Sequence, residues 1–253
     1  MTNIVIAGGC RTLSENEIRI DELTTIPISH IAISGVTGSG KTQLIGYLLI
    51  ELLKRKSKLI LIDPKYSDLY SLKKYIPDTY ARPTEIATAL RIIIEKMNQR
   101  YEHHNSEWGK DYKDYDLNPV FVIIDEAASL LGTSFASKKV REEIQSRLLE
   151  LILRGRQAGY FLILASQRFS SEWIDTSLRA QFTTRFLLGE TDRDSFNMLF
   201  PMLNYKEVPY YNSEVGHGLV KTGLFPGLLL HLTCQILMLL RKSPNSYNAM
   251  LPA

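Results

Sequence analysis

Residues Gly35 to Thr42, with the sequence GVTGSGKT, have the types and the spacing of a phosphate-binding loop. The segment matches the pattern G-x-x-x-x-G-K-[ST] in full, directly after an apolar run and at the start of an amphipathic one. In such a loop, backbone N–H groups surround phosphate oxygens, the lysine reaches the β- and γ-phosphates, and the hydroxyl group ligates Mg²⁺. We therefore expect ATP and Mg²⁺ to be bound here, with Thr42 on the metal, by Gly35, Val36, Thr37, Gly38, Ser39, Gly40, Lys41 and Thr42.

Two adjacent carboxylates, Asp125 and Glu126, follow the apolar run VFVII. Alone, an acidic pair at the end of a strand is usually a solvated turn. In a chain that also has a phosphate-binding loop, Asp125 is predicted to hold Mg²⁺, and Glu126 is predicted to take a proton from the attacking water. A glutamate in this position is typical of ATPases that carry their own catalytic carboxylate, whereas many GTPases use a glutamine.

A further polar residue, Gln167, follows the apolar run LILAS, and it either senses the γ-phosphate or caps the strand. Phosphoryl transfer also gains from a cation placed on the developing charge, and a neighbouring subunit can supply one. Arg154, Arg156, Arg179 and Arg185 are the candidates for this cation. Each of them would more often be a surface ion-pair residue, so the residues alone do not decide among them.

The elements that must position these side chains alternate along the chain. Short runs rich in β-branched and apolar residues predict strands, and longer amphipathic runs predict helices. Strands that alternate with helices indicate an α/β fold with a mainly parallel sheet and helices on both faces. Residues 102–118 are polar and predict a loop. The predicted strands are 28–34, 59–62, 120–124, 160–165 and 184–188, and the predicted helices are 42–54, 83–101 and 138–155.

The composition permits one large domain and excludes several classes of protein. The chain has 253 residues, of which 45% are hydrophobic and 23% charged, so global disorder is not expected. The net charge of +3 permits a polyanionic partner without arguing for one. Two distant cysteines, Cys10 and Cys234, have no metal-ligand spacing and suit a reducing cytosol.

The ends of the chain predict a simple organisation. We expect a short lead-in at 1–27 that contains a hairpin, an ATPase domain at 28–243 and a frayed tail at 244–253. No secretory signal is visible, so a cytoplasmic location is predicted. The apolar stretch 224–240 contains Pro226, Gly227, His231 and Gln235, which favours a buried strand or helix over a membrane span.

The motifs together resemble the motor domain of the FtsK/SpoIIIE family of double-stranded DNA translocases. The matching segments are GVTGSGKT, LIDPKYSDL after the second strand, IIDEAASLL, GTSFASKKV and LRGRQAGYFLILASQRF. They occur in the family's order and span roughly residues 28–199. In the second segment, Asp63 and Lys65 lie at a strand end and are expected to shape the site without an assigned chemical role.

This resemblance implies a RecA-like P-loop NTPase fold and a homo-oligomeric ring, most simply a hexamer, with ATP sites at the subunit borders. Arg185, in FTTR, matches the position at which the family's arginine enters the neighbouring site. The resemblance also implies DNA-facing loops, which place Lys138, Lys139, Arg168 and Ser170 near the duplex. Lysines and small hydroxyl groups suit contacts to phosphate without reading of bases. The other interpretation of the two lysines is a solvated helix start.

Departures from the family pattern keep alternatives open. Phe169 stands where the family usually has proline, residues 200–216 have no clear counterpart, and the role of 200–243 is unassigned. The family's membrane helices and winged-helix module are not found in this sequence. A short motor of this kind looks like those of plasmids, integrative elements or phages, where a membrane or replication protein would be a further partner. The alternatives are a viral DNA-packaging ATPase, a protein-translocating secretion ATPase and a nucleotide-switched scaffold.

Overall fold

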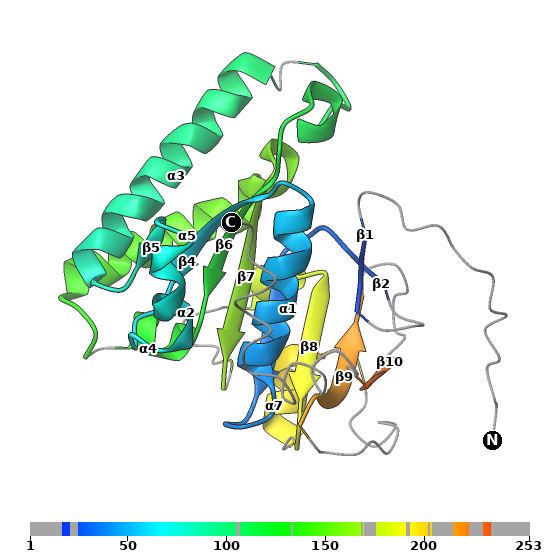
Figure 1. Ribbon diagram of the computed structural model, residues 1–253. Coiled ribbons are helices and arrows are strands. Elements are labelled where there is room, and N and C mark those ends of the chain that lie inside the picture. The colour runs from blue at the N-terminus through cyan, green and yellow to red at the C-terminus, as the bar shows by residue number, and fades with distance from the viewer. Residues whose placement is uncertain are drawn as a thin grey trace, which may run out of the picture.

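The structure is a computed structural model, and it describes residues 17–20, 25–104, 107–132, 134–167, 169, 176–190, 193–201, 203, 215–222 and 230–233. Its centre is an eight-stranded sheet with the strand order β10-β9-β8-β3-β7-β6-β4-β5 (Figure 1). The strands from β8 to β5 in this order run parallel, and β9 and β10 extend the sheet antiparallel beyond β8. The strands of this sheet are β3 (Ile31–Gly35), β4 (Lys58–Ile62), β5 (Thr79–Tyr80), β6 (Val120–Ile124), β7 (Tyr160–Ser166), β8 (Thr184–Leu188), β9 (His217–Lys221) and β10 (Leu230–Thr233).

Helices cover both faces of this sheet, as the alternation of patterns predicts. On one face, α1 (Lys41–Lys54) packs in a core cluster together with the side chains of β3 and β7 that point to this face of the sheet. On the other face, α3 (Pro83–His104) and α5 (Lys138–Ala158) pack side by side over β6 and β7 (Figure 1). Strands β3, β6 and β7 are buried along their whole length, because a parallel sheet is covered on both sides.

Shorter helices connect these elements. The predicted loop at 102–118 contains the 3-10 helix η2, whose Tyr112 is buried against Phe161 with ring centroids 5.8 Å apart. The short helices are α2 (Asp68–Ser71), η1 (Leu72–Lys74), η2 (Tyr112–Tyr115), α4 (Ala127–Leu131), α6 (Thr176–Gln181) and α7 (Arg193–Leu199).

The described part of the lead-in is a hairpin. Strands β1 (Glu17–Arg19) and β2 (Thr25–Pro27) pair antiparallel. Ile18, Ile20 and Ile26 are buried and belong to the core cluster on the α1 face. The guanidinium of Arg55 also donates a hydrogen bond to the Glu17 carbonyl oxygen (2.7 Å). The hairpin therefore packs on the domain instead of standing apart from it.

The segment without an assigned role adds the antiparallel edge of the sheet. Strand β9 pairs with β8, and β10 pairs with β9. The predicted apolar stretch 224–240 contributes β10, and its remaining residues lie outside the described ones, as do all residues of the predicted tail. Among the described residues, the structure contains no helix with the length and apolar character to cross a membrane.

Candidate active site

The predicted site residues meet at one edge of the sheet, because they follow the carboxyl ends of neighbouring parallel strands. The phosphate-binding loop follows β3, Asp125 and Glu126 follow β6, and Gln167 follows β7, which lies between β3 and β6. Ligand sites of open α/β sheets are found at this kind of edge. A cleft of ≈ 860 Å³ opens here, and it is lined by Val36, Thr37, Lys65, Glu126, Ala128, Ser129, Gly132, Ser134 and Gln167.

The loop from Gly35 to Thr42 has the backbone geometry of a phosphate cradle. Gly38 and Gly40 have φ angles of 81° and 102°, which an L side chain rarely adopts. Gly40 is also the N-cap of α1, so the positive end of a helix of 14 residues faces the loop. Gly216, in the turn before β9, donates a backbone hydrogen bond to the Ser39 carbonyl oxygen (3.1 Å). The segment with no assigned role thus supports the loop from outside.

Lys41 is folded back into this cradle. Its ammonium group donates hydrogen bonds to the carbonyl oxygens of Gly35 (2.5 Å) and Val36 (3.1 Å). Burial lowers the pKa of Lys41, whereas the nearby charges of Glu126 and Asp125 act to raise it. A half-buried cation bound to neutral carbonyl groups is well suited to exchange them for phosphate oxygens, so the loop fits a nucleoside triphosphate.

Asp125 lies at the end of β6 among other carboxylates. Burial, together with the negative charges of Asp63 and Glu126, raises the pKa of Asp125 to about 6. The cations of Lys41 and Lys65 act in the opposite direction. A crowded and partly buried carboxylate of this kind is stabilised by a bound cation, and oxygen ligands are those that Mg²⁺ prefers. Asp125 and the Thr42 hydroxyl group, at the start of α1, therefore fit a magnesium ion bound with the phosphates.

Glu126 is held from two sides. One carboxylate oxygen, Oε1, accepts hydrogen bonds from the Ser166 hydroxyl group (3.0 Å) and the Gln167 backbone N–H (3.3 Å). The other oxygen, Oε2, lies 3.5 Å from the ammonium nitrogen of Lys65. Although Glu126 is only 8% exposed, it lines the cleft, so its carboxylate can reach a water molecule there. Both oxygens of this carboxylate therefore have a partner among the described residues.

Asp63 has a structural role that the sequence did not reveal. Its buried carboxylate accepts hydrogen bonds from the backbone N–H groups of Lys65 (3.1 Å), Ser67 (2.7 Å) and Tyr70 (3.0 Å), and from the Ser67 hydroxyl group (2.9 Å). It therefore holds the turn that follows β4. The signal for this role was an aspartate before Pro64 at a strand end, a combination that starts turns.

Gln167 lies at the cleft, whereas Lys138 and Lys139, two of the predicted DNA contacts, do not line it. The Gln167 side chain is exposed and lines the cleft. Lys138 and Lys139 are exposed at the first residues of α5, and Lys138 lies 3.8 Å from Glu142 in a loose ion pair. Arg168 and Ser170 lie outside the described residues.

Arg185 is used inside its own subunit, which argues against the predicted role in a neighbour's site. It lies on β8 and is 9% exposed. Its guanidinium donates three hydrogen bonds, to the backbone carbonyl oxygens of Phe182 (2.7 Å), Leu199 (2.7 Å) and Arg179 (2.8 Å). Moving this side chain to another subunit would leave three carbonyl groups without their donor. The position of Arg185 in the motif FTTR carries no information about its burial.

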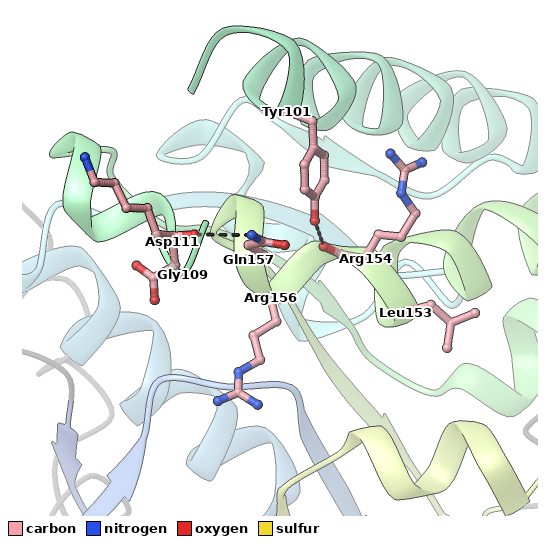
Figure 2. A pocket seen from close by; sticks show the side chains of 8 residues that line it. Tyr101, Gly109, Asp111, Leu153, Arg154, Arg156 and Gln157 are labelled. Carbon is pink, nitrogen blue, oxygen red and sulfur yellow. Dashed lines mark hydrogen bonds between the residues drawn. The ribbon is translucent and has the colours of Figure 1, made fainter. Parts of the chain in front are cut away.

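The other three arginines differ in how strongly they are held. Arg154 pairs with Glu150 (2.6 Å) and donates to the Asn98 side chain (2.8 Å), and Arg179 donates to the Met198 carbonyl oxygen (3.0 Å). Arg156 is exposed, and its guanidinium has no hydrogen bond or ion pair with any residue that the structure describes. Figure 2 shows it pointing away from Tyr101 and Arg154.

Arg156 lines a pocket of ≈ 590 Å³ together with Tyr101, Gly109, Lys110, Asp111, Leu153, Arg154 and Gln157 (Figure 2). These residues include the end of α5, directly before the amino end of β7. The pocket therefore lies at the opposite edge of the sheet from the phosphate-binding loop. A single chain does not bring Arg156 to its own cleft.

Comparisons with known proteins agree with this geometry. The family described as "Helicase HerA, central domain" matches residues 15–187. The FtsK domain-containing protein YdcQ of Bacillus subtilis (strain 168) is 30% identical over 202 residues, which cover 78% of this chain and 41% of that protein. The DNA translocase FtsK of Chlorobaculum tepidum is 33% identical over 193 residues, which cover 67% of this chain and 23% of that protein.

Among solved structures, the pCW3 conjugation coupling protein TcpA, in its monomer form with ATPγS, has a TM-score of 0.75 at 18% identity. The alignment covers 90% of this chain and 71% of that one. EssC (ATPases 2 and 3) of Geobacillus thermodenitrificans has a TM-score of 0.65 at 17% identity, over 89% of this chain and 46% of that one. These two likenesses concern the fold, and they confirm the RecA-like P-loop architecture. The chain spans about two fifths of YdcQ and about a quarter of the translocase.

Proposed function

Because this chain belongs to the HerA helicase central-domain family, we propose that it is the ATPase motor of a DNA translocase, which hydrolyses ATP to move double-stranded DNA. The proposed ATPase activity is supported mainly by the cleft, which is lined both by residues of the phosphate-binding loop and by the buried Glu126. The DNA substrate is supported by the relatives whose names describe DNA translocation. We further propose that the protein is located in the cytoplasm and that it acts together with a membrane-bound or replication protein.

The proposed mechanism uses the residues in and beside the cleft. The Lys41 ammonium exchanges the carbonyl oxygens of Gly35 and Val36 for oxygens of the β- and γ-phosphates. Thr42 and Asp125 would hold Mg²⁺, which supplies charge neutralisation at the phosphates when it is bound. Glu126 accepts a proton from the water that attacks the γ-phosphorus atom in line with the leaving oxygen. The Gln167 side chain donates to a γ-phosphate oxygen and so registers whether the γ-phosphate is present.

We propose that Arg156, not Arg185, is the cation that completes a neighbouring subunit's site. Arg156 is exposed and unpaired among the described residues, whereas Arg185 is buried and bound to three carbonyl groups. A guanidinium directed at the γ-phosphate stabilises the charge of the transition state. This role requires a homo-oligomer, and we propose a hexameric ring with one ATP site at each border.

Contacts to the duplex are proposed for Lys138, Lys139, Arg168 and Ser170. The two lysines are exposed at the start of α5, and Lys138 comes six residues after Gly132, which lines the ATP cleft. Lysine contacts to phosphate release counterions, so they bind DNA without regard to its sequence. If they act in this way, the Lys138→Ala/Lys139→Ala variant should weaken DNA binding and reduce its salt dependence by about one to two released ions.

The test of the function is the ATPase rate measured without DNA, with single-stranded DNA and with duplex DNA. We expect duplex DNA to raise the rate strongly, and we expect Lys41→Ala and Glu126→Gln each to lower it by at least about a hundredfold. Glu126→Gln keeps an acceptor for Ser166 and for the Gln167 N–H, so this variant removes the base with little other change.

Other outcomes of this measurement point to the rival functions. A Lys41-dependent rate that ignores DNA would contradict the DNA translocase and would favour a motor that moves polypeptide. A very slow rate, with a protein partner that binds only in the presence of ATP, would favour a nucleotide-switched scaffold. A motor that packages viral DNA would give the same rates as a translocase, and the genes beside this one would separate the two.

A further inference from the structure

Lys65 is a second cation at the ATP cleft, and the chemistry described above does not use it. Its side chain lines the cleft together with Thr37, Glu126 and Gln167. Its ammonium nitrogen lies 3.5 Å from Oε2 of Glu126. The Lys65 side chain is 46% exposed, so the ion pair alone would contribute little to stability.

The backbone that carries Lys65 is unusually well fixed for a loop. Asp63 accepts hydrogen bonds from the N–H groups of residues 65, 67 and 70, and its own N–H donates to the Tyr80 carbonyl oxygen (3.0 Å). Tyr66, directly after Lys65, has a φ angle of 55°, a conformation that costs about 1–2 kcal/mol for a residue with a side chain. A buried carboxylate and a strained residue thus hold one short turn, and this turn directs Lys65 toward Glu126.

Glu126 needs a partner on this side because its other partners leave one oxygen without support. The hydroxyl group of Ser166 and the N–H of Gln167 both bind Oε1. With only these two bonds, the carboxylate could rotate about its last C–C bond, and Oε2 would have no fixed direction. The Lys65 ammonium draws Oε2 toward the turn after β4, so the carboxylate is held between two strand ends, those of β4 and β7.

We propose that Lys65 is a positioning residue for ATP hydrolysis, which acts by fixing the orientation of the Glu126 carboxylate between β4 and β7. This inference rests on the proposed ATPase and on Glu126 as its base. Lys65 does not bind the nucleotide in this proposal, and Lys41 does. Its loss therefore lowers the rate of the chemical step and leaves nucleotide affinity nearly unchanged.

The experiment uses the full chain and single-turnover hydrolysis at saturating Mg·ATP, with binding of a fluorescent ATP analogue measured in parallel. The variants are Lys65→Ala, Lys65→Arg, Glu126→Gln and the double variant Lys65→Ala/Glu126→Gln. Lys73→Ala is the matched control, because Lys73 is an exposed lysine eight residues along the chain, in η1, and does not line the cleft.

We expect Lys65→Ala to lower the single-turnover rate by about ten- to a hundredfold while nucleotide affinity changes by less than about threefold. Lys65→Arg should recover much of the rate, since a guanidinium can also reach Oε2. The double variant should be no slower than Glu126→Gln alone, because two residues that act as one unit are not additive. Lys73→Ala should behave like the unaltered chain.

Three results would overturn the proposal. A Lys65→Ala rate within about twofold of the unaltered chain would make the pair a surface contact. Loss of nucleotide binding, as in Lys41→Ala, would make Lys65 a phosphate ligand. A double variant slower than Glu126→Gln by the same factor as the single change would show that Lys65 acts independently of Glu126. If Lys41→Ala and Glu126→Gln both kept the full rate, the proposed ATPase site itself would fail.

Discussion

Glu126 has a left-handed backbone conformation, with φ 57° and ψ 68°. A residue with a side chain reaches this region at a cost of about 1–2 kcal/mol, so the surrounding contacts must hold it there. The conformation places Glu126 at the start of α4 and turns its carboxylate toward the end of β7, where Ser166 and Gln167 bind it. Strain of this kind is often found at functional sites, and here it coincides with the predicted base.

Asp125 allows a test by pH. Its pKa is raised to about 6 from 3.8, so the folded protein binds its proton more tightly than the unfolded chain does. Its ionisation therefore costs folding free energy, from nothing near pH 4 to the full amount above about pH 6. We expect Asp125→Asn to stabilise the nucleotide-free protein by about 1–3 kcal/mol near pH 8 in chemical denaturation, and by less as the pH falls toward 4.

The variant Asp125→Asn should also lose the proposed ability of Asp125 to bind Mg²⁺. Mg²⁺ should no longer strengthen nucleotide binding in Asp125→Asn, because the amide has no charge to offer. In the unaltered chain, Mg²⁺-dependent binding should weaken as the pH falls through about 6, since the carboxyl group must lose its proton to bind the metal. A variant that is less stable near pH 8, or an Mg²⁺ effect that it keeps, would contradict this account of Asp125.

At the scale of elements, the join between α5 and β7 depends on Gly159. This residue has a φ angle of 76°, and a Cβ atom added to it would lie 2.6 Å from Cγ of Tyr112. We expect Gly159→Ala to lower the free energy of unfolding by about 2–4 kcal/mol, through both backbone strain and the clash. Gly109 has a similar φ of 82° but open space around it, so Gly109→Ala should cost only about 1 kcal/mol. If denaturant titrations showed that Gly159→Ala and Gly109→Ala lose equal free energies of unfolding, the clash with Tyr112 would be ruled out.

Much of the architecture could be predicted from the sequence, because it depends on local patterns. The runs at 120–124 and 184–188 match β6 and β8, and the phosphate-binding loop lies between a strand and a helix as expected. Strand β9 was not predicted, and the stretch that contains β10 was expected only as a buried strand or helix, because no local pattern encodes the pairing of these short runs at the edge of the sheet. The turn at Asp63 is held by local contacts of its carboxylate, of which the farthest spans seven residues, whereas the burial of Arg185 depends on how β8 and α7 pack in the folded domain.

At the scale of the whole molecule, the ATP cleft and Arg156 lie at opposite edges of one sheet. An arginine supplied by a neighbour can be tested by mixing subunits. We expect Arg156→Ala and Lys41→Ala to be inactive separately and to regain activity when mixed, because the Lys41→Ala subunit still offers its Arg156 to an intact cleft. The measurement is the ATPase rate of the mixture against the sum of the separate rates.

Two controls make this result specific. When the Arg156→Ala subunit is mixed with a Lys41→Ala/Arg156→Ala subunit, the ATPase rate should not be restored, because the double variant offers neither an arginine nor an intact cleft. Arg154→Ala removes a guanidinium from the same pocket, but that guanidinium is already held by Glu150 and Asn98, so its rate should stay near that of the unaltered chain. No gain on mixing would contradict the role of Arg156.

The separation of these two edges also limits how copies of the chain can be related to one another. A twofold axis places the same surface of both partners together, so it could bring a cleft to the partner's Arg156 only if one interface included both edges of the sheet. A heterologous contact joins one edge to the other without this requirement, and such contacts end either in a closed cycle or in an open filament. A chain of this kind would have a built-in direction around its assembly even before DNA enters it.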